Sequence, residues 1–286
     1  MTAQMATQII LNGLVMGAMI ALMAIGLSLI YGIMRVVNFA HGEFYMFAAV
    51  IVFFIIVQAG VSFILASLIA LVAIGLAGWV LDRLVFHRFR GDVVEGSIAA
   101  IAISMGFQSI GWIVFGPVAR AIPSIITGRV EIFGAIMTAE RLLITGVAFA
   151  VIAILAWFIG YTKVGRSMRA VQQDSDAALT QGISVKRVSS LAFGIATALA
   201  ALAGVLMAPV YSIHPVMGFV PLTFALIVVI LGGMGSILGA FIAAMIIGFQ
   251  QSLTGTLLSA ELSMGIGFGL AILILIFRPK GLRGYD

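Results

Sequence analysis

The chain has 286 residues, of which 63% are hydrophobic and 9% are charged, with a net charge of +5 and no cysteine. A typical soluble domain carries about 25% charged residues, so this composition excludes a water-soluble fold and indicates a protein embedded in lipid. The missing cysteines exclude disulfides and thiolate chemistry, and the positive charge lies in short segments between apolar stretches rather than on a nucleic-acid-binding surface.

Apolar segments of about 20 residues, the length that crosses a bilayer as a helix, recur along the whole chain. The clear ones are Ile9–Ile33, Val61–Leu81, Ile98–Phe115, Leu142–Gly160, Val188–Val210, Pro221–Leu238 and Leu262–Phe277. Two shorter ones, Phe44–Val57 and Gly239–Leu253, are either tilted spans or helices that break within the bilayer. The sequence therefore predicts an all-α, polytopic transmembrane bundle of eight or nine spans, with nine favoured, in which residues 1–286 form one domain.

Basic residues gather in three segments between or after these stretches: residues 82–96, residues 161–187 and the tail after Phe277. Because lysine and arginine are retained on the cytoplasmic side of membrane proteins, we expect all three segments in the cytoplasm. The C-terminus is then cytoplasmic and the N-terminus, which has no basic residue before Ile9, is periplasmic. The first apolar stretch is too long for a cleavable signal peptide, so we expect it to stay as a span.

The segment from Arg35 to Glu43 places ionisable side chains between a long and a short apolar stretch. Such groups are costly at membrane depth and usually functional, and irregular backbone is tolerated there only inside protein or beside a water-filled cavity. One interpretation is an embedded break that shapes the inner end of a transport pathway, involving Asn38, His41, Gly42 and Glu43. The other is a tight cytoplasmic turn built on Asn38 and Gly42.

The outer loop, residues 116–141, is long and contains two prolines. Ser124–Thr127 and Val130–Phe133 flank Gly128-Arg129, a pattern that predicts a small β-hairpin. A loop of this length either caps the external mouth of a pathway or is a simple connector.

The basic segment 161–187 carries the signals of a short helix outside the bilayer. Asp174 or Ser175 is suited to cap its start, and Gly182 is suited to end it in the left-handed conformation. A rigid helix between two spans can transmit the movement of a soluble motor subunit to the membrane-spanning helices. A plain amphipathic connector is the alternative interpretation.

The run from Leu231 to Ser236 contains Gly232, Gly233 and Gly235, which weaken a helix by about 1 kcal/mol each relative to alanine. It predicts a helix break or a very close helix crossing. It is no phosphate-binding loop, because none of the lysines in the chain precedes serine or threonine. Any ATP hydrolysis that drives transport therefore belongs to another polypeptide.

Small residues also recur four positions apart within Gly13–Ala21 and Gly235–Ala243. This spacing lets helices approach closely, so each stripe is interpreted as ordinary packing or, alternatively, as a pore-lining or subunit-contact surface. No catalytic or metal site is predicted, because His41, His87 and His214 lie in different segments without ligand spacing.

Three stretches together are similar to the permease family of branched-chain amino-acid ABC importers: Gly26–Phe44, Gly165–Ile183 and Leu231–Ser236. Within the second, Asp176-Ala177-Ala178 followed by Gly182 resembles the loop with which importer permeases dock their ATPase, with Asp in place of Glu. The similarity covers nearly the whole chain in the same order.

The resemblance implies a membrane-spanning permease subunit that translocates branched-chain or other hydrophobic amino acids across a bacterial inner membrane. It implies no enzymatic activity and no cofactor on this chain, with ATP hydrolysed by ATP-binding-cassette partner subunits. The further partners it implies are a second permease, favouring a heterodimer, and a periplasmic substrate-binding protein.

Two groups of site residues are therefore expected, the first from the resemblance and the second from the ionisable segment and the glycine-rich run described above. The residues expected to couple the chain to the ATPase are Gly165, Arg166, Arg169, Asp174, Asp176, Ala177, Ala178 and Gly182. Those expected at the translocation pathway or a helix break are Asn38, His41, Gly42, Glu43, Gly232, Gly233 and Gly235.

The alternative function is an ion- or proton-coupled secondary transporter of small solutes. Such a protein normally carries ionisable residues within its spans, and outside Arg35–Glu43 the sequence has essentially none.

Overall fold

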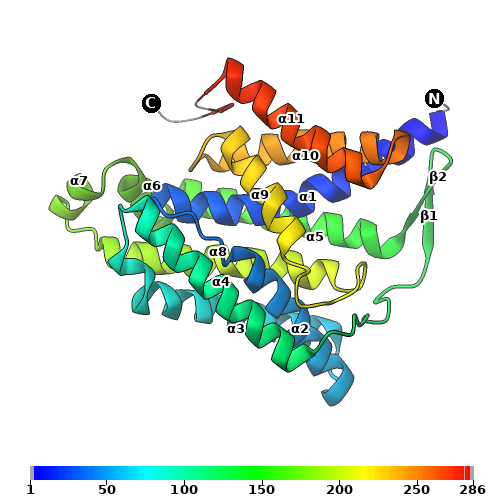
Figure 1. The fold of residues 1–286 in the computed structure, drawn as a ribbon, viewed down its shortest axis with the longest axis horizontal. Coiled ribbons are helices and arrows are strands. Elements are labelled where there is room, and N and C mark those ends of the chain that lie inside the picture. The colour runs from blue at the N-terminus through cyan, green and yellow to red at the C-terminus, as the bar shows by residue number, and fades with distance from the viewer. Residues whose placement is uncertain (1–2, 280, 284–286) are drawn as a thin grey trace.

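The structure is a computed structural model that describes residues 3–279 and 281–283. Most of its helices run along one long axis, with a β-hairpin at one end and the short helices α6 and α7 at the other (Figure 1). The helices up to the hairpin are α1 (Ala3–Met34), α2 (His41–Ala59), α3 (Phe63–Leu84), the 3-10 turn η1 (Phe86–Arg88) and α4 (Val93–Phe115). The hairpin, β1 (Arg129–Ile132) and β2 (Ala135–Thr138), is followed by α5 (Ala139–Tyr161), α6 (Lys163–Gln173), α7 (Ser175–Thr180), α8 (Val185–Met207), α9 (Phe219–Gly232), α10 (Ile237–Leu257) and α11 (Ala260–Phe277).

The polytopic helical bundle expected from the sequence is confirmed. Within the described residues, seven helices are long and apolar enough to cross a membrane, and α9 and α11 are two shorter apolar helices. Which segments are short differs from the expectation. The stretches Phe44–Val57 and Gly239–Leu253 lie inside full-length helices, whereas the predicted span Pro221–Leu238 is interrupted after Gly232.

α2 and α10 are longer than their apolar runs because they include polar residues. In the sequence these residues suggest that the helix ends, but in the fold their side chains are buried or hydrogen-bonded. At the start of α2, His41 is completely buried and Glu43 is 7% exposed, so the helix begins three residues before its apolar run. Near the end of α10, the Ser252 hydroxyl donates to the carbonyl of Ile9 at 2.7 Å, and the helix continues to Leu257.

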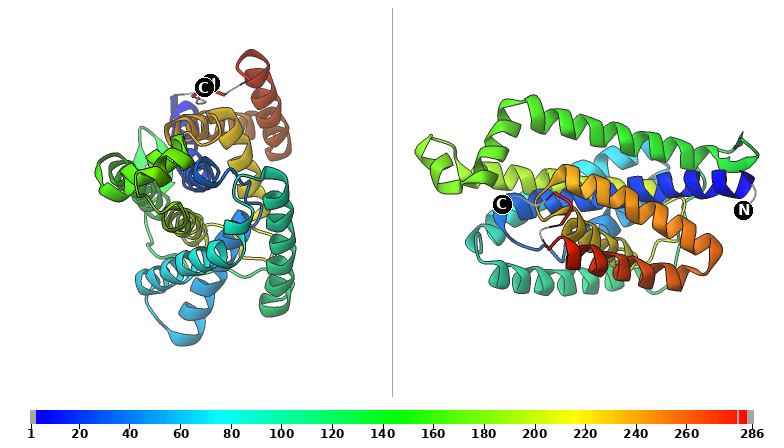
Figure 2. Two further views of the ribbon diagram at one scale, coloured as in Figure 1. Left: turned by 90° about the vertical axis from the view of Figure 1, so that its left-hand side faces the viewer. Right: turned by 90° about the horizontal axis from the view of Figure 1, so that it is seen from above.

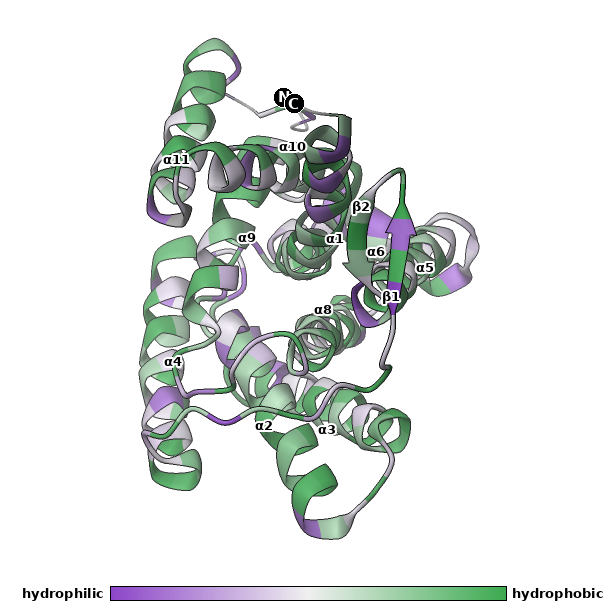
Figure 3. Ribbon diagram, turned by 90° about the vertical axis from the view of Figure 1, so that its right-hand side faces the viewer, coloured by the Kyte–Doolittle hydropathy of each residue, from purple (hydrophilic) through white to green (hydrophobic). Residues whose placement is uncertain are grey.

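The centre of the bundle is formed by α1 and α8. In their most apolar stretches 89% of α1 residues and 78% of α8 residues are buried, against 17% for α4 and 22% for α3 and α5. The end-on views place α1 and α8 in the middle of the helices, with α3, α4 and α5 around them (Figures 2 and 3). The residues of these outer helices are largely apolar, as contact with lipid requires (Figure 3).

The first small-residue stripe is a packing surface between α1 and α10. A Cβ placed on Gly13 would meet the Phe249 ring, and one on Gly248 would meet the backbone of Gly17. The second stripe is not continuous, because Gly235 lies in the turn before α10 rather than on the helix. Gly239, at the start of α10, instead packs against the backbone of Gly232 at the end of α9.

The predicted outer hairpin is present, but its turn is displaced. Arg129 pairs with Thr138 and Ile132 with Ala135, so the turn lies at Phe133-Gly134 and not at Gly128-Arg129. Both turn residues have positive φ, 49° and 80°, as a tight two-residue hairpin turn requires. Glycine at the second turn position supplies this without strain.

Candidate functional site

The segment between α1 and α2 is embedded in the bundle. Asn38 and His41 are completely buried, and the Asn38 side-chain oxygen accepts a hydrogen bond from the Ala40 backbone at 3.1 Å. A Cβ on Gly26 of α1 would lie 3.1 Å from Nε2 of His41. Because Gly26 precedes the end of α1 by about 12 Å along the helix, α2 begins well inside the bundle. Of the two interpretations left open by the sequence, the embedded break describes this geometry; its role in transport stays a prediction.

The start of α9 meets the start of α2 at this depth. A Cβ on Gly42 would lie 2.7 Å from the carbonyl oxygen of Gly218, the residue that precedes α9, so neither position has room for a side chain. Two helices therefore begin beside each other inside the bundle, an arrangement that discontinuous helices of transporters use at solute sites. The sequence singled out Gly42 but not Gly218, because a single glycine after an apolar loop carries no distinctive signal.

Of the ionisable side chains of this segment, His41 and Glu43 are buried, whereas Arg35 is exposed. Oε1 of Glu43 accepts a hydrogen bond of 3.1 Å from the Ser104 hydroxyl on α4. The backbone of Met23 lies close to His41, but neither ring nitrogen has a hydrogen-bond partner with good geometry among the described residues.

A second break lies between α9 and α10, where the glycine-rich run predicted one. Gly233 and Gly235 have φ values of 97° and 90°, which end α9 and start the turn. Ser236 then caps α10, its hydroxyl accepting from the backbone of Gly239 at 3.1 Å. The close crossing is also present, because Gly232 and Gly239 are in backbone contact.

The C-terminal tail holds the end of α9. The backbone nitrogen of Leu282 donates to the carbonyl of Leu231 at 2.8 Å, and that of Arg283 donates to Gly232 at 3.0 Å. These bonds satisfy carbonyls that a helix end leaves free. The second break is therefore fixed from two directions, by α10 and by the tail.

The short helix predicted in the basic segment is present as α7. The carboxylate of Asp174 accepts from the backbone of both Asp176 and Ala177 at 2.9 Å, and Gly182 follows with φ 78°. The sequence missed α6, which precedes α7 and buries Gly165, Met168 and Val171 on one face.

Only one of the α7 residues expected to couple the chain to an ATPase points into the bundle. Ala178 is 3% exposed, whereas Asp176 and Ala177 are exposed and Leu179 is 55% exposed. An exposed leucine on a helix at the polar end of the molecule is available to a partner protein.

Three other residues expected in coupling make contacts within the chain. The guanidinium of Arg169 donates to the carbonyls of Ile159 and Gly160, and that of Arg166 donates to Tyr161 at 3.1 Å. Cations at this position pair with the free carbonyls at the end of α5. Gly165 has no room for a side chain, because a Cβ there would meet the same end of α5. These residues fix α6 against α5, and their contact with an ATPase stays a prediction.

A residue that the sequence did not single out links α6 to the second break. Gln172 on α6 donates from Nε2 to the carbonyl of Gly235 at 2.8 Å. Gly32 of α1 packs against both, since a Cβ on it would lie 3.0 Å from the Gln172 amide nitrogen and 3.3 Å from Gly235. A glutamine in an amphipathic helix carries no signal of such a contact.

A polar cavity of about 650 Å³ lies at the same end of the molecule. Arg35, Arg90 and Lys186 line it together with Asp174 and Asp176. Burial lowers the pKa of the Arg90 guanidinium, and the neighbouring Asp82 carboxylate opposes that shift. The cavity is therefore lined both by α7 and by the start of the chain that leads from α1 into the first break.

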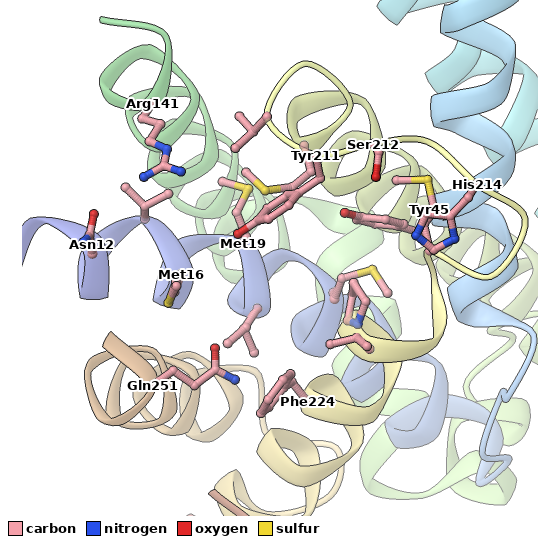
Figure 4. Close-up of a pocket in the computed structure, with 18 of the residues that line it drawn as sticks. Asn12, Met16, Met19, Tyr45, Arg141, Tyr211, Ser212, His214, Phe224 and Gln251 are labelled. Atoms are coloured by element: carbon pink, nitrogen blue, oxygen red, sulfur yellow. The ribbon is translucent and has the colours of Figure 1, made fainter. Parts of the chain in front are cut away.

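A second, largely apolar cavity of about 360 Å³ lies toward the hairpin end. Its lining combines α1, α9, α10, the start of α5, the last residue of α8 and residues 210–217 after that helix. Figure 4 shows Arg141 and Asn12 at one end of this cavity and Tyr45 and His214 at the other. Tyr45 belongs to α2 and Phe224 to α9, so both of the helices that begin inside the bundle contribute to its wall. None of the sequence-predicted site residues lines it.

No group of three or more potential metal-ligating side chains occurs within residues 3–279 and 281–283. The apolar cavity lies toward the hairpin end of the bundle, and the polar cavity lies at the opposite end, beside the second break, where Gln172 contacts Gly235.

The family model described as branched-chain amino acid transport system / permease component matches residues 9–277. The chain is 35% identical to the high-affinity branched-chain amino acid transport system permease protein LivH of Escherichia coli K12, over 96% of this chain and 94% of LivH. It is 32% identical to the corresponding permease protein BraD of Pseudomonas aeruginosa, over 97% of this chain and 95% of BraD. A shorter match, 35% identical over 42% of this chain, is to the permease protein LivM of the same Escherichia coli system.

Among solved structures, the chain is similar to PsaBC from Streptococcus pneumoniae in complex with Fab. The TM-score is 0.56 with 15% sequence identity, and the match covers 94% of this chain and 91% of that one. At this identity the likeness concerns the fold alone.

Proposed function

Because the chain belongs to the family of branched-chain amino acid transport system permease components, it is a multi-pass membrane permease, and we propose that it is one permease subunit of an ATP-driven importer of hydrophobic amino acids. The hairpin end faces the periplasm and α6–α7 face the cytoplasm of a bacterium, following the positive-inside rule. ATP is hydrolysed by separate ATP-binding-cassette subunits, and a periplasmic binding protein delivers the solute.

The observation that carries this proposal is the path from α7 to α9. The exposed face of α7, with Asp176, Ala177 and Leu179, offers a docking surface for an ATPase subunit. Behind it, Gln172 connects α6 to the turn at Gly235. That turn ends α9, whose other end meets α2 at the Gly42–Gly218 contact.

A movement of α7 is therefore transmitted along α9 to the first break and to the wall of the apolar cavity. Helices that are packed without side chains at their crossings can slide past each other with little steric cost. The Gly42–Gly218 contact gives that freedom to the start of α9, whereas its other end is held by the backbone hydrogen bonds of Leu282 and Arg283. Alternating access follows from tilting α9 between two positions of the coupling helix.

The second permease is proposed from the relatives, since LivH and LivM are both named permease proteins of the high-affinity branched-chain amino acid transport system. This chain aligns with LivH nearly end to end and with LivM over less than half of its length. We therefore expect it to occupy the LivH-like position of a heterodimer.

The test is reconstitution of the chain with its ATPase, second permease and binding protein in liposomes. Leucine uptake is expected only when ATP is present on the side of the vesicle membrane that α6 and α7 face, the side that corresponds to the cytoplasm. In the same system Leu179→Asp is expected to reduce co-purification of the ATPase at least tenfold, because it places a charge on the docking surface. Gln181→Asp, at the exposed residue that follows α7, is the matched control and is expected to retain the ATPase.

A secondary transporter is the competing function, and buried carboxylates such as Glu43 in α2 and Asp82 in α3 favour it. Uptake of leucine by the chain alone, driven by a proton gradient, establishes that alternative and refutes the importer.

A further inference from the structure

The apolar cavity toward the hairpin end has a polarity that fits one kind of solute. Within the described chain, Arg141 is its one charged lining residue, and no carboxylate lines it. The Arg141 guanidinium makes no hydrogen bond or ion pair with any other described residue. A guanidinium in this situation is a binding group for an anion, and a carboxylate matches its paired donors.

A second hydrogen-bond donor of the cavity also lacks an acceptor. Nε2 of Gln251 is buried and has no partner within the described residues. Leaving a buried donor unpaired is costly, so a ligand that supplies an acceptor is favoured. Gln251 and Arg141 come from α10 and α5, on different sides of α1 (Figure 4).

The rest of the cavity wall is apolar and suits ligands with uncharged side chains of different shapes. Met16, Met19 and Met23 follow one face of α1, and Phe224 faces them from α9. Methionine adapts its shape to different apolar groups, so a site of this composition accepts several branched or linear side chains. A volume of about 360 Å³ is at the small end of ligand sites, which span about 300–1,000 Å³.

The cavity offers neutral oxygen atoms to a ligand ammonium group. Figure 4 draws Tyr211 between Arg141 and Tyr45, and the Tyr211 hydroxyl has no hydrogen-bond partner among residues 3–279 and 281–283, so its oxygen can accept from the α-ammonium group of a ligand whose carboxylate lies on Arg141. One ammonium group can be accommodated in this way. A second positive charge, as on lysine, has no counterion here and must lose its hydration.

We propose that this cavity is the selectivity site of the permease, binding one free α-amino acid with its carboxylate on Arg141 and its apolar side chain against the α1 methionines. The assignment rests on the proposed function and adds the ligand class and orientation to it. It excludes solutes without a carboxylate and solutes with a cationic side chain.

The experiment uses the complete transporter complex in lipid nanodiscs, without the binding protein, and measures retention of radiolabelled leucine. Competition is with unlabelled leucine, leucinamide, which lacks the carboxylate, and lysine. Leucinamide and lysine are expected to compete at least tenfold more weakly than leucine. Arg141→Gln is expected to weaken leucine binding at least tenfold and to bring leucine and leucinamide within twofold of each other. Arg129→Gln, in the exposed hairpin strand, is the control and is expected to bind as wild type.

A cavity-filling variant provides a second, independent readout. Met19→Trp is expected to abolish leucine retention and ATP-driven leucine uptake while the complex still assembles and hydrolyses ATP. If Arg141→Gln fails to assemble, Arg141→Lys keeps the charge and is expected to retain leucine preference with reduced affinity.

The outcomes separate the two levels of the proposal. The proposed site is wrong if both cavity variants bind leucine as the wild type does, with unchanged selectivity. It is also wrong if a complex that still imports leucine shows no specific leucine binding. Neither result contradicts the proposed importer. A complex that does not assemble with an ATPase or import any hydrophobic amino acid overturns the importer itself.

Discussion

Gln172 and Gly235 are 2.8 Å apart, amide nitrogen to carbonyl oxygen, and this hydrogen bond joins the helix pair α6–α7 to the turn that ends α9. The contact is direct, and Gly32 of α1 leaves room for it. Because α9 contributes Phe224 to the wall of the apolar cavity, the bond connects α6–α7 to a helix of that cavity.

Gln172→Ala is expected to uncouple transport from ATP hydrolysis. Loss of one neutral hydrogen bond changes the coupling free energy by about 1 kcal/mol, or about fivefold in leucine transported per ATP. The measurement is uptake and phosphate release in the same proteoliposomes. Gln173→Ala removes the exposed neighbouring glutamine and is expected to keep the wild-type ratio. An unchanged ratio in both variants contradicts the role of Gln172.

Asp174→Ala is expected to loosen α7, because its carboxylate caps two backbone amides of that helix. Loss of such a cap costs about 1 kcal/mol, so amide hydrogen exchange at Asp176 and Ala177 is expected to accelerate about fivefold. Asp174→Asn retains the acceptor oxygen and is the matched control. Equal exchange rates in the wild type and the alanine variant are inconsistent with capping by Asp174.

Gly248→Ala is expected to lower the thermal stability of the bundle, because the added Cβ meets the backbone of Gly17 on α1. Forcing this contact apart costs about 1–3 kcal/mol. Gly255→Ala lies on the same helix with nothing within 4 Å of the added carbon, and it is expected to be neutral or stabilising. The readout is the melting temperature of both variants in detergent. A Gly248→Ala protein that melts with the wild type shows that α1 and α10 are not packed this closely.

Glu43→Gln tests whether the buried carboxylate carries protons. Glutamine keeps an oxygen to accept the Ser104 hydrogen bond, so ATP-driven leucine uptake is expected to change less than about twofold. The proton-ionophore sensitivity of uptake is expected to match that of the wild type. A large loss of uptake, accompanied by dependence of the wild type on a proton gradient, favours the secondary transporter instead.

Local signals in the sequence are sufficient for the membrane-embedded class, for most spans and for α7. Hydropathy over about 20 residues reports transfer into lipid, and this free energy depends on composition rather than on partners. The Asp174 cap and the left-handed Gly182 act within one helical turn, so their residue types are informative by themselves. The same holds for the break at Gly233–Gly235.

The tertiary structure decided what depends on contacts between distant segments. It buried His41 and Glu43 and so moved the start of α2, placed Gly218 against Gly42, and gave Gln172 its partner. It also assembled the apolar cavity from α1, α5, α9 and α10, none of whose lining residues stood out in the sequence. In lipid, apolar helices have no hydrophobic preference for one neighbour over another, so their partners are set by shape and hydrogen bonding, which exist only once the bundle is packed.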